Sequence, residues 1–553
     1  MYGRLRLVIC LLMAALCAAG FQAARAGSTE NAAGNHAGVE GAATPSGEHA
    51  AAGAGEAPGP LLKLSVTRHT YKLPDGGALD YTATAGYMRL KDEAQKPRAD
   101  IFFVAYTVDG RDKVSRPLTF LFNGGPGASS AWLHMGVAGP MRVITDGDKP
   151  PAGPPYAPVH NPYSWLPWTD LVFIDPVGTG FSRAIPPQDA KHFWNVKSDV
   201  QSVGDFIRLY TSTCGRWPSV KYLAGESYGG MRAAGLLSYL YRNFGMEIDG
   251  LVLISPALDL KLIQPDSAND LPYVLFLPSY AATAWYHKKI APRYRGASLS
   301  QVLEEAEKWA VGEYMPALVK GDLLDEPEKE RIAEKFAALT GLPQTLVRNS
   351  DLRVGRRDFT AELLRSEGLS LGFLDGRTVL PDGSGGFLND PGMAQTFGPY
   401  AAALNEYLTG ELKFAPGIAY IAFSNEANSQ WDWGSMFPGR DALDSIRKAL
   451  DRNRRLRILA AGGYFDLDVP YFGTSYTMNH IGAAAGLRQN ITVRFFPGGH
   501  MFYTSSEAIE AFTGEAARFF GAGAPGAGGK NRGSASGKGF GPKAEPDGKS
   551  VKK

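Results

Sequence analysis

The chain has 553 residues, of which 44% are hydrophobic and 20% charged. This is the composition of an ordinary globular protein, with enough apolar material for a large core. The formal net charge is only +2, which excludes a strong electrostatic attraction to nucleic acid or to a membrane surface. Neither is therefore a predicted partner.

The first 26 residues have the pattern of a secretory signal peptide. Arg4 and Arg6 supply positive charge, an apolar run covers 7–19, and residues 24–26 (Ala-Arg-Ala) fit a cleavage site. The apolar run is too short to span a bilayer comfortably. We therefore expect an exported protein without stable membrane insertion after cleavage, and an uncleaved anchor is the alternative.

The number and positions of the cysteines indicate the cellular compartment. Cys10 and Cys17 lie within the predicted signal, so Cys214 alone remains in the mature chain, which can then form no internal disulfide. An exported protein without disulfides suggests the bacterial cell envelope, with the protein either periplasmic or secreted. We interpret Cys214 as a small packed residue.

Alternating strand and helix patterns begin after an Ala/Gly-rich stretch that we predict to be a disordered linker. Edge strands or a hairpin are expected at 63–71, 79–87 and 101–107, and central strands at 118–122, 170–175, 220–225, 249–255, 456–461 and 491–497. Helical patterns at 197–211 and 231–244 fall between them. This alternation is typical of an α/β fold with a mostly parallel central sheet flanked by helices.

A stretch of different character, 258–420, interrupts the alternation. It contains two amphipathic segments, 300–311 and 326–339, and we predict an inserted helical cap that shapes a pocket. The predicted organisation is a signal peptide (1–26), a disordered linker (27–60), the first part of the core (61–257), the cap (258–420), the second part of the core (421–523) and a disordered basic Gly-rich tail (524–553).

The most specific motif is Gly-Glu-Ser-Tyr-Gly-Gly at 225–230, between a predicted strand and a predicted helix. A sharp strand-to-helix turn with the pattern G-x-S-x-G is the nucleophile elbow of an α/β-hydrolase. Small glycines let the turn close and lift the Ser227 hydroxyl clear of the sheet. A hydroxyl is a weak nucleophile, so this site needs a base and an acid that orients the base.

Both partners follow in the order expected for this fold. Asp466 lies on a loop after the predicted strand 456–461, and His500 lies in a glycine loop after 491–497. Ser227 would attack, His500 would transfer the proton, and Asp466 would hold the imidazole tautomer. Asp468, two residues further on, is the competing acid.

An oxyanion needs hydrogen-bond donors placed in advance. The backbone N–H of Tyr228, directly after the nucleophile, is one candidate. The second is the N–H of Gly125, in the Asn-Gly-Gly-Pro-Gly loop at 123–127 that follows the strand 118–122.

Five ordered motifs together resemble the serine carboxypeptidases, with this chain as a bacterial-type member; they lie at 123–130, 161–165, 175–182, 225–230 and 499–501. The resemblance implies an α/β-hydrolase fold without a cofactor. It also implies peptide substrates, which lose their C-terminal residues by way of an acyl-enzyme.

The resemblance further implies a network that binds the terminal carboxylate of the substrate. Asn123, Gly124, Glu226 and Met501 stand at positions that match this part of the family's pattern. Burial would raise the pKa of a carboxyl placed like that of Glu226. If Glu226 must be protonated to hydrogen-bond a carboxylate, cleavage of peptides favours acidic pH.

Two positions depart from the family's network. Leu121 stands where the family has Trp, and Val137 stands where it has a second Glu. A carboxylate without charge-assisted donors binds weakly. Arg142 and Arg232 are the candidates for compensation.

No metal site is predicted, because neither H-E-x-x-H nor C-x-x-C occurs. An esterase or acyltransferase on the same triad is the main alternative function. A non-catalytic binding protein on a hydrolase scaffold is the third. The oligomeric state and the preferred C-terminal residue stay open.

Overall fold

A computed structural model describes residues 61–145, 153–266, 269–381, 390–434 and 439–521. The predicted signal peptide (1–26), linker (27–60) and C-terminal tail (524–553) lie outside the described residues. Within the described ranges, no helix is both long and apolar enough to cross a bilayer.

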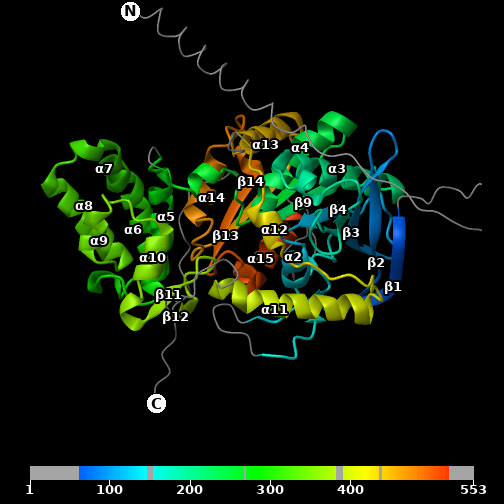
Figure 1. The fold of residues 1–553 in the computed structure, drawn as a ribbon, viewed down its shortest axis with the longest axis horizontal. Coiled ribbons are helices and arrows are strands. Elements are labelled where there is room, and N and C mark those ends of the chain that lie inside the picture. The colour runs from blue at the N-terminus through cyan, green and yellow to red at the C-terminus, as the bar shows by residue number, and fades with distance from the viewer. Residues whose placement is uncertain (1–60, 146–152, 267–268, 382–389, 435–438, 522–553) are drawn as a thin grey trace, which may run out of the picture. The chain divides into compact units, whose positions relative to one another are not determined.

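One ten-stranded sheet organises the chain (Figure 1). Its first three strands are antiparallel: β1 (Leu61–Lys72), β2 (Ala78–Lys91) and β3 (Pro97–Val108). Six parallel strands follow in the spatial order β7 (Asp170–Ile174), β4 (Leu118–Phe122), β9 (Lys221–Glu226), β10 (Gly250–Ile254), β13 (Arg457–Gly463) and β14 (Ile491–Phe496). The two-residue strand β8 (Arg183–Ala184) pairs with β3.

The central strands are short apolar runs because helices cover both of their faces. Phe120 packs with α3 (Val196–Thr213) and α4 (Tyr228–Phe244), together with α13 (Gly439–Arg452). Its neighbour Leu121 points to the other face, which α11 (Pro391–Glu406) and α15 (Ser506–Phe519) cover. The mostly parallel sheet flanked by helices confirms the predicted α/β-hydrolase fold.

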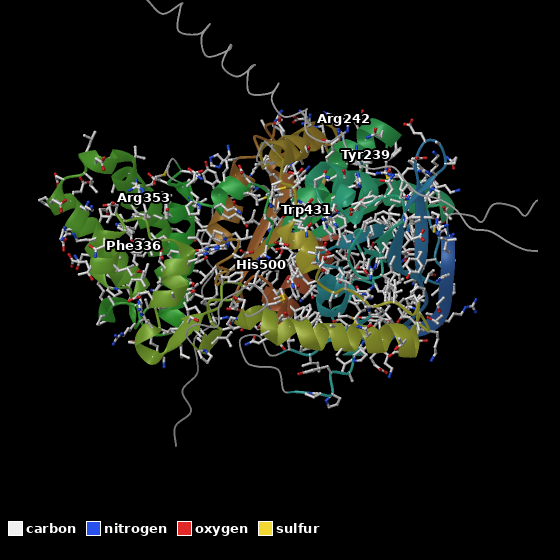
Figure 2. All side chains as sticks on the ribbon, viewed as in Figure 1. Tyr239, Arg242, Phe336, Arg353, Trp431 and His500 are labelled. Carbon is white, nitrogen blue, oxygen red and sulfur yellow. The ribbon has the colours of Figure 1, made fainter. Side chains whose placement is uncertain are left out.

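A second apolar core belongs to the cap. It is built by α5 (Leu271–Tyr286), α6 (Leu299–Trp309), α7 (Met315–Lys320), α8 (Glu326–Thr340), α9 (Gln344–Asn349) and α10 (Arg356–Glu362). Figure 2 shows Phe336 and Arg353 among these helices, apart from His500. The amphipathic segments predicted at 300–311 and 326–339 correspond to helices α6 and α8.

The range 258–420 that we predicted for the cap contains residues that pack in two different clusters. The apolar cluster of the cap takes most of its residues from 274–371 and also includes Leu467. The later helix α11 packs through Tyr400 and Leu404 onto the core cluster of the sheet. Amphipathic helices of the cap and of the core have the same sequence pattern, so the pattern alone could not separate them.

Short elements complete the described chain. They are the strands β5 (Met141–Arg142), β6 (Val159–His160), β11 (Leu369–Leu371) and β12 (Val379–Pro381), the helices α2 (Ala131–Leu133), α12 (Asn425–Ser429) and α14 (Tyr471–Asn479), and helical turns that include η1 (His134–Ala138) and η11 (Phe502–Thr504).

Gly225 marks the closest approach of β9 to the helix that follows it. A Cβ at this position would lie 2.2 Å from the carbonyl oxygen of Gly229, so the backbone would have to move. We predict that Gly225→Ala lowers the free energy of unfolding by about 3 kcal/mol. Thermal unfolding measures this loss as a lower melting temperature.

Gly312 in the cap is the matched control, because a Cβ there would meet nothing within 4 Å. Gly312→Ala should leave the melting temperature unchanged or raise it. Equal melting temperatures for the two variants would contradict the close packing at Gly225.

Candidate active site

Ser227 stands at the turn between β9 and α4 in a strained backbone conformation, with φ of 58° and ψ of −126°. A residue with a side chain adopts such angles at a cost of about 1–3 kcal/mol, so its surroundings must hold it there. The Ser227 N–H donates to the carbonyl of Ile254, and its own carbonyl accepts from Gly230 and Ala257. The turn is therefore fixed from both sides.

The Asn-Gly-Gly-Pro-Gly loop lies directly against this turn. A Cβ on Gly124 would come within 2.6 Å of both the Glu226 carbonyl oxygen and the Tyr228 nitrogen. Gly125, with φ of 93°, lines the same pocket as Ser227. The two predicted oxyanion donors, the N–H groups of Gly125 and Tyr228, thus belong to two segments in backbone contact, as an oxyanion hole requires.

Asp466 and His500 come together at the carboxyl edge of the sheet. The Asp466 Oδ2 atom lies 2.8 Å from Nδ1 of His500, and Oδ1 accepts the N–H groups of Asp468 and Val469. Asp466 is fully buried. Two hydrogen bonds fix the loop of His500. The His500 N–H donates to the Leu374 carbonyl, and the His500 carbonyl accepts from Ser255 Oγ.

The electrostatics of this pair follow from burial and proximity. Burial raises the pKa of the Asp466 carboxyl, while the neighbouring His500 opposes that change. Burial alone would lower the pKa of His500, but the adjacent Asp466 carboxylate raises it above its usual range. A carboxylate that accepts from Nδ1–H leaves Nε2 of the imidazole to take a proton.

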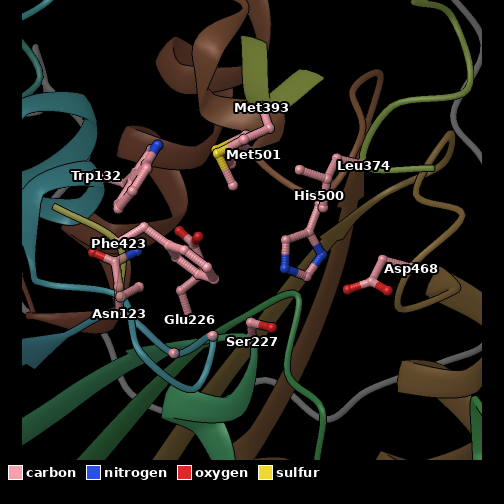
Figure 3. Close-up of a pocket in the computed structure, with 13 residues that line it drawn as sticks. Asn123, Trp132, Glu226, Ser227, Leu374, Met393, Phe423, Asp468, His500 and Met501 are labelled. Atoms are coloured by element: carbon pink, nitrogen blue, oxygen red, sulfur yellow. The ribbon is translucent and has the colours of Figure 1, made fainter. Parts of the chain in front are cut away.

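Asp468 has a different partner. Its carboxylate lies 2.5 Å from Nη1 of Arg356 in cap helix α10, and it also lines the pocket near His500 (Figure 3). Of the two acids that the sequence left in competition, Asp466 is the one whose carboxylate is hydrogen-bonded to the imidazole.

Glu226 is buried at the opposite side of the pocket, with 5% of its surface exposed. The Tyr503 hydroxyl donates to its Oε2 atom at 2.6 Å, and the Asn123 side chain also bonds to it. Burial raises the pKa of Glu226 to about 7, although His500, Tyr503 and Asn123 oppose this. Asn123 is oriented by the N–H of Leu133, which donates to Oδ1.

The two positions that depart from the family's network bring no polar group to the pocket. Leu121 and Val137 are both buried in the apolar core, at 0% and 1% exposure. Arg232 is paired with Asp199 at 2.7 Å and donates to the Asn123 carbonyl. Arg142 lies over the ring of Tyr163. Neither arginine is among the described residues that line the pocket.

The pocket encloses about 60 Å³ and brings together Asn123, Gly124, Gly125, Glu226, Ser227, His500 and Met501, all predicted from the sequence (Figure 3). The sequence did not single out Trp132, Leu374, Met393 and Phe423, which add apolar surface. Trp132 lies close to a motif and could have been suspected. The other three come from segments without any motif.

Two aromatic groups that do not line the pocket have packing roles. The apolar run of α5 fills the core of the cap with Val274, Phe276 and Tyr280. Trp431 and Trp433 contact the ring of Tyr228. In the part of the chain that the structure describes, no three His, Cys, Asp or Glu side chains gather to hold a metal ion.

A family model described as serine carboxypeptidase matches residues 74–275. Serine carboxypeptidase-like 38 of Arabidopsis thaliana is 30% identical over 220 residues, which cover 38% of this chain and 42% of that protein. Carboxypeptidase Y of Saccharomyces cerevisiae is 28% identical over 214 residues, 37% of each chain. The chain thus matches less than half the length of either relative.

A solved structure supports the fold over a longer range. The crystal structure of Kex1(delta)p, a prohormone-processing carboxypeptidase from Saccharomyces cerevisiae, superimposes with a TM-score of 0.50 at 17% sequence identity. The alignment covers 79% of this chain and 91% of that one.

The contacts of the two acids predict different effects of removing each charge. Asp466→Asn keeps the shape of the side chain but gives His500 the wrong tautomer, so kcat should fall by about 10⁴-fold. Asp468→Asn removes an ion pair to the cap and should lower kcat by less than about tenfold. Steady-state kinetics on a p-nitrophenyl ester measures both. A larger loss for Asp468→Asn would reverse the assignment.

Proposed function

We propose that this chain is an exported serine carboxypeptidase, because residues 74–275 match the model of the serine carboxypeptidase family and two relatives of that family are similar to the chain. It releases single residues from the C-termini of peptides through an acyl-enzyme on Ser227. The apolar run and the Ala-Arg-Ala sequence at the N-terminus support export to the bacterial periplasm or beyond. No cofactor is needed for this chemistry.

The observation that carries the proposal is a buried carboxyl beside the nucleophile. Glu226 and the amide of Asn123 line the pocket that also holds Ser227 and His500. A neutral carboxyl and an amide N–H are both donors that a terminal carboxylate accepts from. An ionised Glu226 would repel that carboxylate instead. The site therefore suits a substrate whose scissile bond lies one residue from a free C-terminus.

The proposed reaction uses the groups that line the pocket and the Asp466–His500 pair. His500 takes the proton of Ser227 as the hydroxyl attacks the peptide carbonyl, and Asp466 stabilises the imidazolium. The N–H groups of Gly125 and Tyr228 stabilise the oxyanion. His500 then donates the proton to the leaving amine, so the C-terminal amino acid departs. Water attacks the acyl-enzyme by the same route and frees Ser227.

A serine esterase or acyltransferase is the second candidate, because Leu121 and Val137 bring apolar side chains to two positions of the carboxylate network. The same triad would then act on a substrate without a terminal carboxylate. A non-catalytic binding protein is the third candidate. Covalent labelling by a fluorophosphonate that disappears in Ser227→Ala excludes it, whereas an unlabelled native protein supports it.

The function is tested with one blocked dipeptide in two forms, the free acid and the C-terminal amide. Mass spectrometry follows cleavage from about pH 4 to pH 8. We expect cleavage of the free acid, strongest on the acidic side, and none with Ser227→Ala. Equal cleavage of both forms, or turnover of simple esters alone, would favour the esterase or acyltransferase.

Glu226→Gln tests the proposed role of the carboxyl. Because the pKa of Glu226 is about 7, the neutral form that binds a carboxylate is lost as pH rises through that value. In the native enzyme kcat/KM for the free acid should therefore fall above about pH 7, by up to about tenfold per pH unit. Gln stays neutral, so this fall should vanish in the variant.

The ester of the same blocked peptide is the control, because it carries no terminal carboxylate. Its kcat/KM should show no alkaline fall above about pH 7 in either the native enzyme or Glu226→Gln, because binding of the ester needs no neutral Glu226. An alkaline fall for the free acid that persists in Glu226→Gln would assign the fall to another group.

A further inference from the structure

Tyr503 stands three residues after His500 in the turn η11 and is completely buried. Its hydroxyl donates to Oε2 of Glu226 at 2.6 Å, and its oxygen also bonds to the Asn123 side chain. The triad mechanism uses neither contact. The role of this buried phenol, which is hydrogen-bonded to a buried carboxyl beside the pocket, is therefore separate from that of the triad.

The backbone next to Tyr503 leaves room for it. A Cβ on Gly136 in η1 would lie 2.8 Å from the Tyr503 ring and 2.7 Å from the hydroxyl oxygen of Tyr400. The adjacent Val137 is apolar and buried. On this side of the pocket, two tyrosines and Asn123 thus supply the polar atoms that surround Glu226.

We propose that Tyr503 is a positioning residue, which fixes the orientation and the protonation site of the Glu226 carboxyl so that it can donate to the terminal carboxylate of a peptide. This rests on the proposed function. An Oε2 atom that accepts from Tyr503 is the carbonyl oxygen of the neutral acid, so the acidic proton is carried by Oε1. Without Tyr503 the two oxygens are interchangeable and the proton has no fixed direction.

The groups that face Glu226 come from four segments of the chain: Asn123, Tyr400, Asp466, and His500 with Tyr503. His500 and the two hydrogen-bond donors favour the ionised form of Glu226, and Asp466 favours the neutral form. A donor to a carboxylate lowers its pKa. Removal of the Tyr503 hydroxyl therefore raises the pKa of Glu226 and extends the neutral form to higher pH.

Tyr503→Phe removes one oxygen atom and keeps the ring. For the free-acid dipeptide, we expect KM below pH 6 to rise about tenfold with kcat changed less than about twofold. The alkaline fall in kcat/KM should move up by about one pH unit. The ester of the same peptide should show neither change.

Tyr314→Phe is the matched control, because that buried hydroxyl also donates at 2.6 Å, to the Leu352 carbonyl in the cap. It should cost similar stability and leave KM and the pH profile unchanged. Equal effects of Tyr503→Phe on free acid and ester, or no effect on either beyond that of Tyr314→Phe, would mean that Tyr503 is only a packing residue and would overturn the proposal.

A titration without substrate separates this proposal from the proposed function. Infrared difference spectra record the carbonyl stretch of protonated Glu226, assigned by its loss in Glu226→Gln. In Tyr503→Phe the band should persist to higher pH and move to higher frequency, because a hydrogen bond to the carbonyl is lost. An unchanged band overturns the positioning role, even if the native enzyme cleaves no peptide. A shifted band without peptide cleavage overturns the peptide substrate and, with it, the part of the proposal that concerns a terminal carboxylate.

Discussion

The close contact of two backbone segments, the turn at Ser227 and the loop at Gly124, is the constraint on which the rest of the site depends. Each segment can approach the other only where a side chain is missing: a Cβ on Gly124 would collide with Tyr228, and a Cβ on Gly229 would lie 2.8 Å from the Phe122 carbonyl oxygen. This contact sets the nucleophile and both candidate oxyanion donors in one rigid unit. The backbone contacts that hold this unit also maintain the strained backbone angles of Ser227.

A buried ion pair between helices α3 and α4 stabilises this unit. Arg232 on α4 binds Asp199 on α3 and donates to the Asn123 carbonyl, and the Tyr228 hydroxyl donates to the same aspartate. The pair is almost fully buried, so removing either charge would leave the other unpaired at a high cost. The hydrogen-bonding groups of Arg232 are therefore used by Asp199 and by the Asn123 carbonyl. Under the proposed function, recognition of a terminal carboxylate relies on Asn123 and Glu226, so the orientation of this single carboxyl matters.

The parallel strands and the order Ser, Asp, His were predictable because buried apolar runs and a glycine turn leave strong local signals. The choice between Asp466 and Asp468 was harder, since two residues of spacing do not reveal which carboxylate meets His500. Tyr503 and Met393 could not be predicted at all. Their roles depend on where η11 and α11 pack against the sheet. That packing is decided by contacts between residues far apart in the sequence, such as Thr396 with Met501, which are 105 positions apart.

Glu226 and His500 also act on each other, and this joins recognition to catalysis. An ionised Glu226 raises the pKa of His500, and a charged His500 lowers the pKa of Glu226. Neutral Glu226 with neutral His500 holds the same number of protons as ionised Glu226 with charged His500. The pH alone therefore does not determine which of these two states is populated. Under the proposed function, a bound carboxylate makes that choice, because it attracts a protonated Glu226 and repels an ionised one. Its arrival keeps the proton on Glu226 and leaves the imidazole free to act as the base, so a substrate with a free C-terminus would prepare the enzyme for its own cleavage.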